Sequence, residues 1–482
     1  MSRIAYLVLA AAVFALPGAG AGAAVRSAGH VEPVVTHGVV VGDVTAHTAV
    51  LWARADREGT LKVHLSGGRH HGVERLETHA ADDYTGQVLL TGLKPGTTYR
   101  YRVGSTRGTF ETAPAAHDRD NVRLAFGGDL AGQNVCRDAS EGFPIMETIR
   151  AERPDVFVGL GDMIYADNAC TALGMYGNPQ VPGPGPAADL ATFWSHWRYN
   201  RADEPSQRLL ASTSYVGVWD DHEVVNDFGP LNDTRSAPPY TPGVHLLPIG
   251  LEAFLDYTPI DVAANTPKRL YRSLRWGKHL ELFVLDTRQY RDANAASDSP
   301  DRPKTMLGRE QLTWLKESLA ASDATWKVIV SSVPMSIPTG FPAVPNGRDG
   351  WANFDQTTGF EQELLDILRF MEQNGIVNNL WITTDVHFAE AFRYRPFPAN
   401  PGFVVHELAT GPLNAGIFPN RDVDQTLRPE VLTFFGDFAT TWEQAKRFFN
   451  FGTLEVARTG ELTAEIVNTA GDTQFALTLT PR

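Results

Sequence analysis

The feature that most constrains this chain is a set of polar clusters, each of which directly follows a short hydrophobic run expected to form a β-strand. In open α/β sheets, ligands bind beyond the carboxyl ends of the strands. The clusters are therefore predicted to converge on one rim and to form a single site. In chain order they are Phe126-Gly127-Gly128-Asp129, Leu160-Gly161-Asp162-Met163-Ile164-Tyr165, the segment from Trp219 to Asn226, and Asp385-Val386-His387.

Strands and helices alternate after about residue 121, which predicts an α/β domain. One amphipathic helix is indicated by leucines at 312, 315 and 319, and another by apolar residues from Phe360 to Met371 at helical spacing. The second helix is expected to stop at Asn374-Gly375. A helix is also expected over residues 144–152, and three β runs close the chain.

Residues 37–112 have a different pattern and are predicted to form a small all-β sandwich. Short β-rich runs alternate there with turns at a spacing typical of sandwiches. The segment GLKPGTTYRYRV resembles the late strand pair of a fibronectin type III-like module. A linker follows, so the domains are expected at residues 37–112 and 121–482.

The composition is that of a globular protein, with 43% hydrophobic and 20% charged residues among 482. A net charge of −14 and the lack of a basic cluster in the sequence argue against a nucleic-acid-binding protein. Residues 1–23 combine Arg3, a short apolar run and a small-residue exit, which predicts a signal peptide and a secreted or periplasmic protein. No transmembrane segment is expected after its removal.

Several carboxylates in one pocket repel one another, and bound cations relieve that repulsion. Asp and Asn oxygens suit hard ions, imidazole suits transition metals, and a Tyr phenolate suits ferric iron. Two cations about 3.5–4 Å apart can bridge a phosphoryl oxygen and generate hydroxide near neutral pH. The residue types therefore predict a metal-dependent phosphoesterase.

The ordered set FGGD, GLGDMIYAD, VWDDHEVVND, LDTRQYRD and TTDVH resembles the PhoD-like alkaline phosphatase/phosphodiesterase family of the metallophosphatase superfamily. The resemblance covers nearly the whole chain after the signal peptide. It implies a four-layer α/β/β/α metallophosphatase domain behind the sandwich. It also implies hydrolysis of small phosphate esters with iron (Fe³⁺) and calcium (Ca²⁺) as cofactors.

Site roles carry over from the family by position. Asp162 would bridge two metal ions, and Tyr165 and His387 would bind the iron-type ion. Asp221 and Asp385 would bind the second ion. Asn226 would orient phosphate or bind a further calcium. His222 would be the catalytic acid or would stabilise the transition state, and a metal-bound hydroxide would be the nucleophile.

One departure concerns Asp129, which stands where iron-containing members often have Cys. Asp is a harder ligand, so iron, manganese, zinc and calcium all remain candidates for the first ion. The two cysteines, Cys136 and Cys170, favour one disulfide in an exported protein. The alternative is that Cys136 supplies the missing iron thiolate.

Substrate contacts are expected from Asn134 and Arg137, which follow Asp129, and from Arg288 or Arg291. For Arg288 a structural pair with a local Asp is an equal alternative. Two other functions stay open. One is a phospholipase D-like phosphodiesterase, and the other is a non-catalytic binding protein stabilised by metals.

Overall fold

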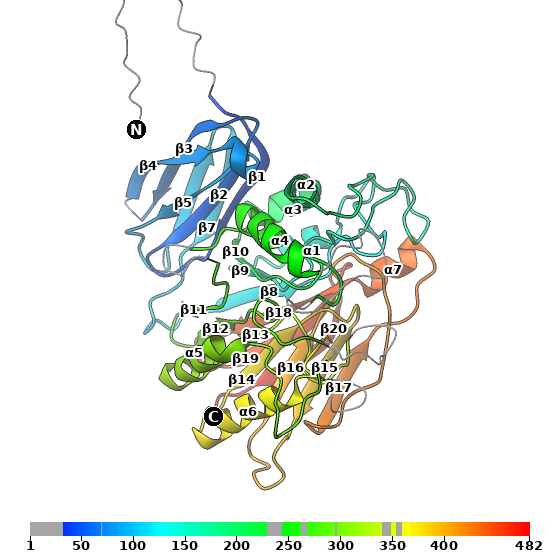
Figure 1. The fold of residues 1–482 in the computed structure, drawn as a ribbon. Coiled ribbons are helices and arrows are strands. Elements are labelled where there is room, and N and C mark those ends of the chain that lie inside the picture. The colour runs from blue at the N-terminus through cyan, green and yellow to red at the C-terminus, as the bar shows by residue number, and fades with distance from the viewer. Residues whose placement is uncertain are drawn as a thin grey trace, which may run out of the picture. The chain divides into compact units, whose positions relative to one another are not determined.

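Two β-sheets packed face to face form the centre of the fold, with helices on both outer sides (Figure 1). The computed structural model describes residues 32–68, 70–228, 243–261, 268–294, 296–339, 349–352 and 359–482. The expected signal peptide, residues 1–23, lies outside the described residues.

The first sheet has nine strands in the order β20-β19-β18-β8-β9-β10-β1-β2-β5. Its centre is parallel and fully buried, as expected for short apolar runs such as Val156–Gly159. The strands are β1 (Val35–Gly42), β2 (Ala49–Ala55), β5 (Thr85–Leu90), β8 (Val122–Gly127), β9 (Val156–Gly159), β10 (Ser214–Gly217), β18 (Asn450–Val456), β19 (Leu462–Asn468) and β20 (Thr473–Leu479).

The second sheet has seven strands in the order β11-β12-β13-β14-β16-β15-β17. Strands β12, β13, β14 and β16 run parallel, and the outer strands pair antiparallel. The strands are β11 (Arg272–Trp276), β12 (Leu280–Val284), β13 (Trp326–Val330), β14 (Asn379–Thr383), β15 (Ala389–Tyr394), β16 (Val405–Ala409) and β17 (Pro429–Phe435).

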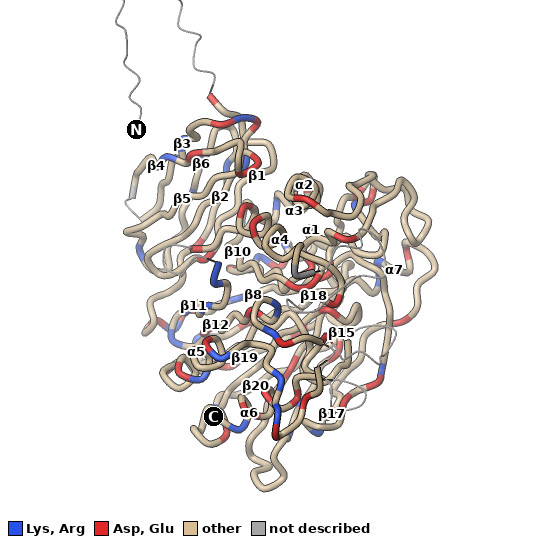
Figure 2. Tube along the Cα trace, in the orientation of Figure 1, with Lys and Arg blue, Asp and Glu red and all other residues tan. Residues whose placement is uncertain are grey.

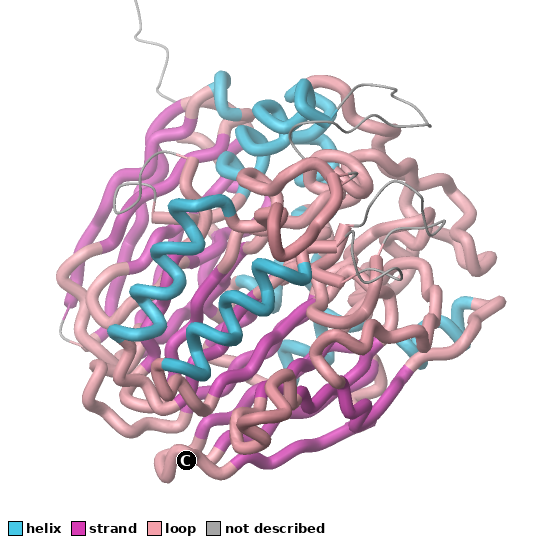
Figure 3. Tube along the Cα trace, turned by 60° about the horizontal axis from the view of Figure 1, so that its bottom comes forward, coloured by secondary structure: helices cyan, strands magenta, loops and turns pink. Residues whose placement is uncertain are grey.

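Helices complete the four layers. The two helices predicted from leucine spacing, α5 and α6, cover the outer face of the seven-stranded sheet, where Figure 3 shows them crossing in front of the strands. Leu315 and Leu319 of α5 are buried there, as their spacing requires. The helices are α1 (Ile145–Ala151), α2 (Leu190–Arg201), α3 (Glu204–Leu210), α4 (Gly243–Tyr257), α5 (Gly308–Ala321), α6 (Glu361–Gln373) and α7 (Trp442–Phe448), with a 3₁₀ turn η1 (Ala80–Asp82).

Three hydrophobic clusters fill the spaces between these layers. One lies between the two large sheets and continues into the N-terminal region. A second lies between the nine-stranded sheet and helices α1 to α4, and a third lies under α5 and α6. The predicted α/β/β/α architecture with an N-terminal sandwich is thus confirmed. Among the described residues, no helix is long and apolar enough to cross a membrane.

The N-terminal sandwich shares one of its two sheets with the rest of the chain. One of its sheets has four strands in the order β4-β3-β6-β7: β3 (Gly59–Gly67), β4 (His70–Thr78), β6 (Thr98–Val103) and β7 (Thr106–Glu111). The other half, β1-β2-β5, continues the nine-stranded sheet, because β1 pairs in parallel with β10 through Val41 and Ser214. Sequence patterns within 37–112 carry no signal for this pairing, since the partner strand lies about 170 residues further along the chain.

Candidate active site

The loops after three neighbouring strands begin at the same level of the nine-stranded sheet. In the parallel register, Gly127 of β8 and Gly217 of β10 both pair with Gly159 of β9. The loop after β14 of the other sheet meets them, since the Thr384 hydroxyl donates to Asp129 Oδ2 at 2.6 Å. The four polar clusters predicted from the sequence are therefore brought together at one rim between the two sheets.

Several residues at this rim have a left-handed backbone conformation. Asp129, Asp162, Asp385 and His387 all have positive φ, at 62°, 53°, 79° and 61°. Residues other than glycine seldom adopt this left-handed conformation, and such strain gathers at functional sites. Gly161 makes the tight turn possible, because a Cβ there would lie 2.6 Å from the Cβ of Asp220.

One group of donor atoms comprises Asp129, Tyr165 and His387, all buried. The Tyr165 hydroxyl lies 3.1 Å from His387 Nε2 and donates to Asp129 Oδ1 at 3.3 Å. His387 Nε2 is 3.7 Å from the same carboxylate oxygen. The other ring nitrogen, Nδ1, is hydrogen-bonded to the Gly416 carbonyl oxygen, so Nε2 is the nitrogen that faces Asp129 and Tyr165.

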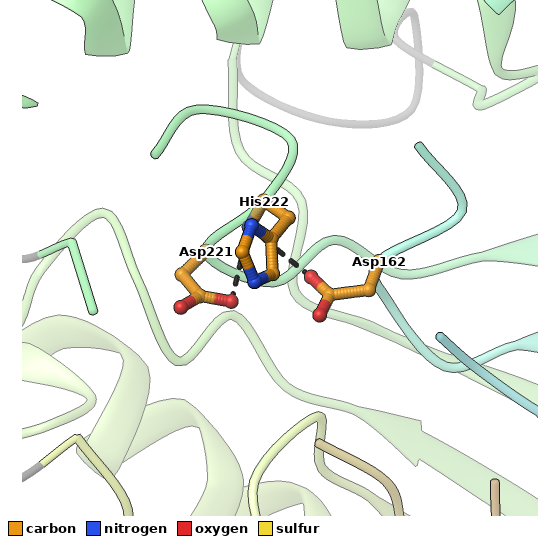
Figure 4. Close-up of side chains that lie close together, drawn as sticks. All are labelled: Asp162, Asp221 and His222. Carbon is orange, nitrogen blue, oxygen red and sulfur yellow. Dashed lines mark hydrogen bonds between the residues drawn. The ribbon is translucent and has the colours of Figure 1, made fainter. Parts of the chain in front are cut away.

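A second group consists of carboxylates. Single oxygens of Asp162, Asp220, Asp221 and Asp385 all lie within 4.8 Å of one another, a spacing that fits one cation. Asp162 Oδ2 and Asp385 Oδ2 are buried and accept no hydrogen bond from any described residue. Figure 4 shows Asp162 and Asp221 on either side of His222, whose backbone N–H donates to both, at 3.1 and 3.0 Å.

The electrostatics show why these groups suit cations. Burial raises the pKa of Asp162 well above its usual value, and the neighbouring carboxylates Asp221 and Asp220 raise it further. Burial and like charges also raise the pKa values of Asp385 and Asp220, the latter to about 7 although Arg288 opposes the rise. Burial and nearby Asp162 likewise raise the pKa of Tyr165. Bound cations would reverse these shifts and keep the oxygens ionised.

His222 has the opposite electrostatic setting. Burial alone would lower its pKa, but Asp167 and Asp221 outweigh burial and raise the pKa to about 9. Asp167 Oδ1 lies 2.7 Å from His222 Nδ1, which leaves Nε2 for other contacts. The Tyr165 ring lies against the imidazole, with centroids 3.9 Å apart. His222 is thus held as a protonated donor beside the carboxylate group.

Sequence reasoning missed two supporting carboxylates. Asp167, two residues after Tyr165, holds His222 and also accepts from the Asn226 N–H at 3.0 Å. Glu223 accepts the backbone N–H groups of Asp162, Met163 and Asp220, at 3.0, 2.7 and 2.7 Å. Both lie inside the motifs MIYAD and DDHE. Their position within those motifs was the available signal.

Arg288 is held by carboxylates of three aspartates, Asp220, Asp221 and Asp349. It is fully buried, and its guanidinium binds Asp220 Oδ1 at 2.5 Å and the carboxylate of Asp349. Arg291 pairs with the same Asp349 at 2.7 Å. These contacts favour the structural alternative, in which Arg288 pairs with aspartates, over a contact with substrate. The partner Asp349 is 61 residues away, too far for sequence spacing to reveal.

The other predicted substrate contacts have local partners. The Asn134 side chain donates to the Leu173 carbonyl at 3.0 Å and accepts from the Thr171 N–H at 2.9 Å, which fixes a neighbouring loop. Arg137 donates to the Tyr199 carbonyl at 2.9 Å and stacks over the Tyr199 ring. These contacts give both residues a role in holding loops.

Asn226 is exposed at the edge of the site. The residue after it, Asp227, lies within 4.8 Å of Asp221 and Asp349 through single oxygens. Asp227 therefore adds a carboxylate next to Asn226, the residue expected to orient phosphate or bind a further calcium.

Cys136 and Cys170 form a disulfide that ties the loop after Asp129 to the loop after Tyr165. This is the pairing that two cysteines in an exported chain favour. With its sulfur in the disulfide, Cys136 is not a thiolate ligand, and Asp129 keeps the position near Tyr165 and His387.

The chain matches known proteins along most of its length. The family model for PhoD-like phosphatase matches residues 125–465, and the model for the N-terminal domain of PhoD-like phosphatase matches residues 21–116. Alkaline phosphatase D of Bacillus subtilis (strain 168) is 25% identical over 454 residues, which cover 84% of this chain and 74% of that protein.

Two solved structures share the fold. The structure of PhoD aligns with a TM-score of 0.71 at 19% identity, over 93% of this chain and 92% of that one. The purple acid phosphatase PPD1 from yellow lupin aligns with a TM-score of 0.62 at 13% identity, over 93% and 74%. The matched regions contain all four polar clusters of the site. The chain therefore belongs to the PhoD-like phosphatase family, and is a metal-dependent phosphoric ester hydrolase.

Proposed function

We propose that this protein is an exported phosphoesterase that hydrolyses phosphomonoesters, phosphodiesters or both at a site for two cations. Asp129, Tyr165 and His387 would hold the first cation. Asp221 and Asp385 would hold the second, and Asp162 would bridge the two.

The observation that carries this proposal is the buried carboxylate group around Asp162, in which single oxygens of Asp162, Asp220, Asp221 and Asp385 lie within 4.8 Å of one another. Asp129 also raises the pKa of Asp162, and Asp162 raises the pKa of Tyr165, so the two donor groups interact electrostatically. One buried oxygen of Asp162 has no hydrogen-bond donor among the described residues. A buried carboxylate oxygen without a donor is costly, and a cation would satisfy it.

When bound, the two cations would neutralise the carboxylates, polarise the phosphoryl oxygens and activate a water molecule. His222 would then serve the leaving group. Asp167 fixes Nδ1 and keeps the ring protonated, so Nε2 can donate a proton to the departing alcohol oxygen or stabilise its charge. Thr384 fixes the orientation of Asp129.

Tyr165 favours ferric iron for the first cation, because phenolate is a characteristic ligand of that ion. Asp129 adds an oxygen where the family pattern has sulfur, so manganese, zinc and calcium are to be tested beside iron. The carboxylate set around Asp221 fits a hard ion such as calcium for the second position.

Export and domain boundaries complete the proposal. The charged and apolar pattern of residues 1–23 supports a signal peptide, and the Cys136–Cys170 disulfide fits an oxidising compartment. We assign the sandwich to residues 37–112 and the catalytic domain to residues 121–482. N-terminal sequencing of the protein recovered from outside the cytoplasm would locate the cleavage.

The test uses p-nitrophenyl phosphate and bis(p-nitrophenyl) phosphate, before and after removal of metals with a chelator. We expect chelation to abolish hydrolysis and added iron with calcium to restore it. His222→Ala should lower kcat at least about a hundredfold while the metal content stays unchanged. His117→Ala, in which an exposed histidine is removed, is the matched control and should keep full activity.

Two results would overturn the proposal. Activity that survives both chelation and His222→Ala would remove the mechanism. A protein that binds metals in the expected ratio but hydrolyses neither ester would be a metal-stabilised binding protein instead. The ratio of the two rates decides between monoesters and diesters.

A further inference from the structure

The outer face of the four-stranded sheet β4-β3-β6-β7 is strongly basic. The strand register places Lys62 opposite Arg75 and Arg102 opposite Arg107, with Arg100 two residues before Arg102 on the same face. We call the surface formed by these five side chains the basic face. Figure 2 marks the Lys and Arg positions on the trace.

The carboxylates of the strand residues on this side lie only at its two ends. At one end Glu77, opposite Thr60, lies 3.6 Å from Arg75 and forms an ion pair with it, and at the other end Glu111 pairs with Thr98 in the ladder. Among the described residues, no carboxylate is within ion-pair distance of Arg100, Arg102 or Arg107. The chain as a whole carries a net charge of −14. The basic face is thus opposite in sign to the rest of the protein.

Such an arrangement is unfavourable for the sheet alone. Like charges directly opposite each other on neighbouring strands destabilise the pairing, as Arg102 and Arg107 do here. A hollow of about 730 Å³, lined in part by His64, Arg100, Arg102 and Arg107, opens on the same face. An anionic ligand in that hollow would turn the repulsion into attraction.

We infer that the basic face binds a phosphate-bearing polymer other than a nucleic acid and tethers the enzyme to a polymeric substrate. This inference rests on the proposed function, which it narrows to substrates with repeated phosphate groups. The planar guanidinium groups of arginine match phosphate oxygens two at a time. Same-face arginines on one strand are about 6.6–6.8 Å apart and neighbouring strands about 4.8 Å apart, so a flexible chain of phosphates can reach several at once.

Two other anionic partners fit the face less well. Single-stranded nucleic acids are held largely by bases stacked on aromatic rings, but the rings of Tyr99, Tyr101 and Phe110 point into the core. Membrane surfaces are bound with help from apolar and aromatic side chains that enter the lipid. On this face Val73 is the exposed apolar strand residue, at 54% exposure.

The test compares the full-length enzyme with Arg100→Ser/Arg102→Ser/Arg107→Ser. The control, Arg302→Ser/Arg309→Ser/Arg447→Ser, removes three exposed arginines elsewhere. Binding of fluorescent inorganic polyphosphate is measured by anisotropy over a range of salt concentrations, with excess inorganic phosphate present to occupy the catalytic centre. Polyglutamate, oligothymidylate and phosphatidylserine vesicles are the competing probes.

We expect the basic-face variant to bind polyphosphate at least tenfold more weakly, with the slope of log K against log salt reduced by about 2. The control should bind like the wild type, and all three proteins should hydrolyse p-nitrophenyl phosphate equally. Unchanged polyphosphate binding in the basic-face variant would overturn the inference. Equal or stronger binding of polyglutamate, oligothymidylate or vesicles would also overturn it. Because binding is read separately from hydrolysis, an inactive enzyme with normal binding would refute only the proposed function.

Discussion

Asp167 offers the most direct test of how this site handles protons. Its carboxylate is buried and lies 2.7 Å from His222 Nδ1. Burial lowers the pKa of His222, and Asp167 is the largest influence that raises it, to about 9. The substitution Asp167→Asn keeps the size of the side chain and its ability to accept a hydrogen bond but removes the charge.

The expected loss of activity can be worked out from the raised pKa of His222. A rise from 6.5 to about 9 corresponds to roughly 3 kcal/mol at about 1.4 kcal/mol per pH unit. Because Asp167 is the largest of the influences that raise the pKa of His222, ahead of Asp221, its loss should lower that pKa by about one to two pH units. A general acid contributes about 10²–10⁴-fold to a rate. We therefore expect kcat above pH 8 to fall at least about tenfold.

The protonated form of His222 acts as the acid, so activity should be lost as pH rises. In the wild type, Asp167 raises the pKa of His222, so activity should decline only at alkaline pH. In Asp167→Asn the decline should begin at lower pH. The assay measures kcat from pH 5 to 11 on two monoesters, p-nitrophenyl phosphate and glycerol phosphate. Glycerol is the poorer leaving group and needs the acid more, so its hydrolysis should fall further.

Asp118→Asn is the matched control, because it removes a carboxylate beside an exposed histidine, His117. It should leave both profiles unchanged. The reasoning fails if Asp167→Asn has the same alkaline limb as the wild type, or if both esters lose rate equally. A loss of bound metal that parallels the loss of activity would show instead that Asp167 supports the cation site.

Three further outcomes are expected. After chelation, the melting temperature should fall as pH rises from about 4 to 8. Burial raises the pKa values of Asp220 and Glu223 to about 7 and 8, so the folded protein binds their protons more tightly than the unfolded chain does, and stability is lost as these protons leave. Added cations should remove this dependence of the melting temperature on pH. Cys136→Ser/Cys170→Ser, which opens a loop with a sequence separation of 34, should lower the free energy of unfolding in urea by about 3–4 kcal/mol. Arg288→Met should lower the free energy of unfolding by about 3–5 kcal/mol, because it leaves buried carboxylates unpaired. If Arg288 bound phosphate instead, the substitution would raise KM and leave the stability unchanged.

Much of the fold could be predicted because its signals are local. The buried strands β8, β9, β12, β13 and β14 are short apolar runs, and α5 and α6 have clear helical spacing. Helix α2 was missed although Phe193, Trp197 and Arg201 recur on its buried side, because its aromatic residues are weak helix formers. The parallel pairing of β1 with β10 depends on tertiary packing and has no local signal.

The site was predictable where polar residues follow buried strands. Asp129, Asp162, Tyr165 and His387 could be named from that rule and from the family resemblance, and they lie together. The supports of those residues were harder to find, because each makes contact across loops that sequence spacing does not relate. Glu223 is an example, since it fixes three backbone N–H groups in two loops.

Arg288 supplies only part of the positive charge that the carboxylates need. Its guanidinium binds Asp220 and Asp349 and lies 3.7 Å from an oxygen of Asp221. Burial and like charges still hold the pKa values of Asp220 and Asp385 above their usual values, although Arg288 opposes the rise. Asp162 and Asp385 then keep buried oxygens with no donor among the described residues. A cation held by Asp162, Asp220, Asp221 and Asp385, single oxygens of which lie within 4.8 Å of one another, would satisfy these oxygens and keep them ionised.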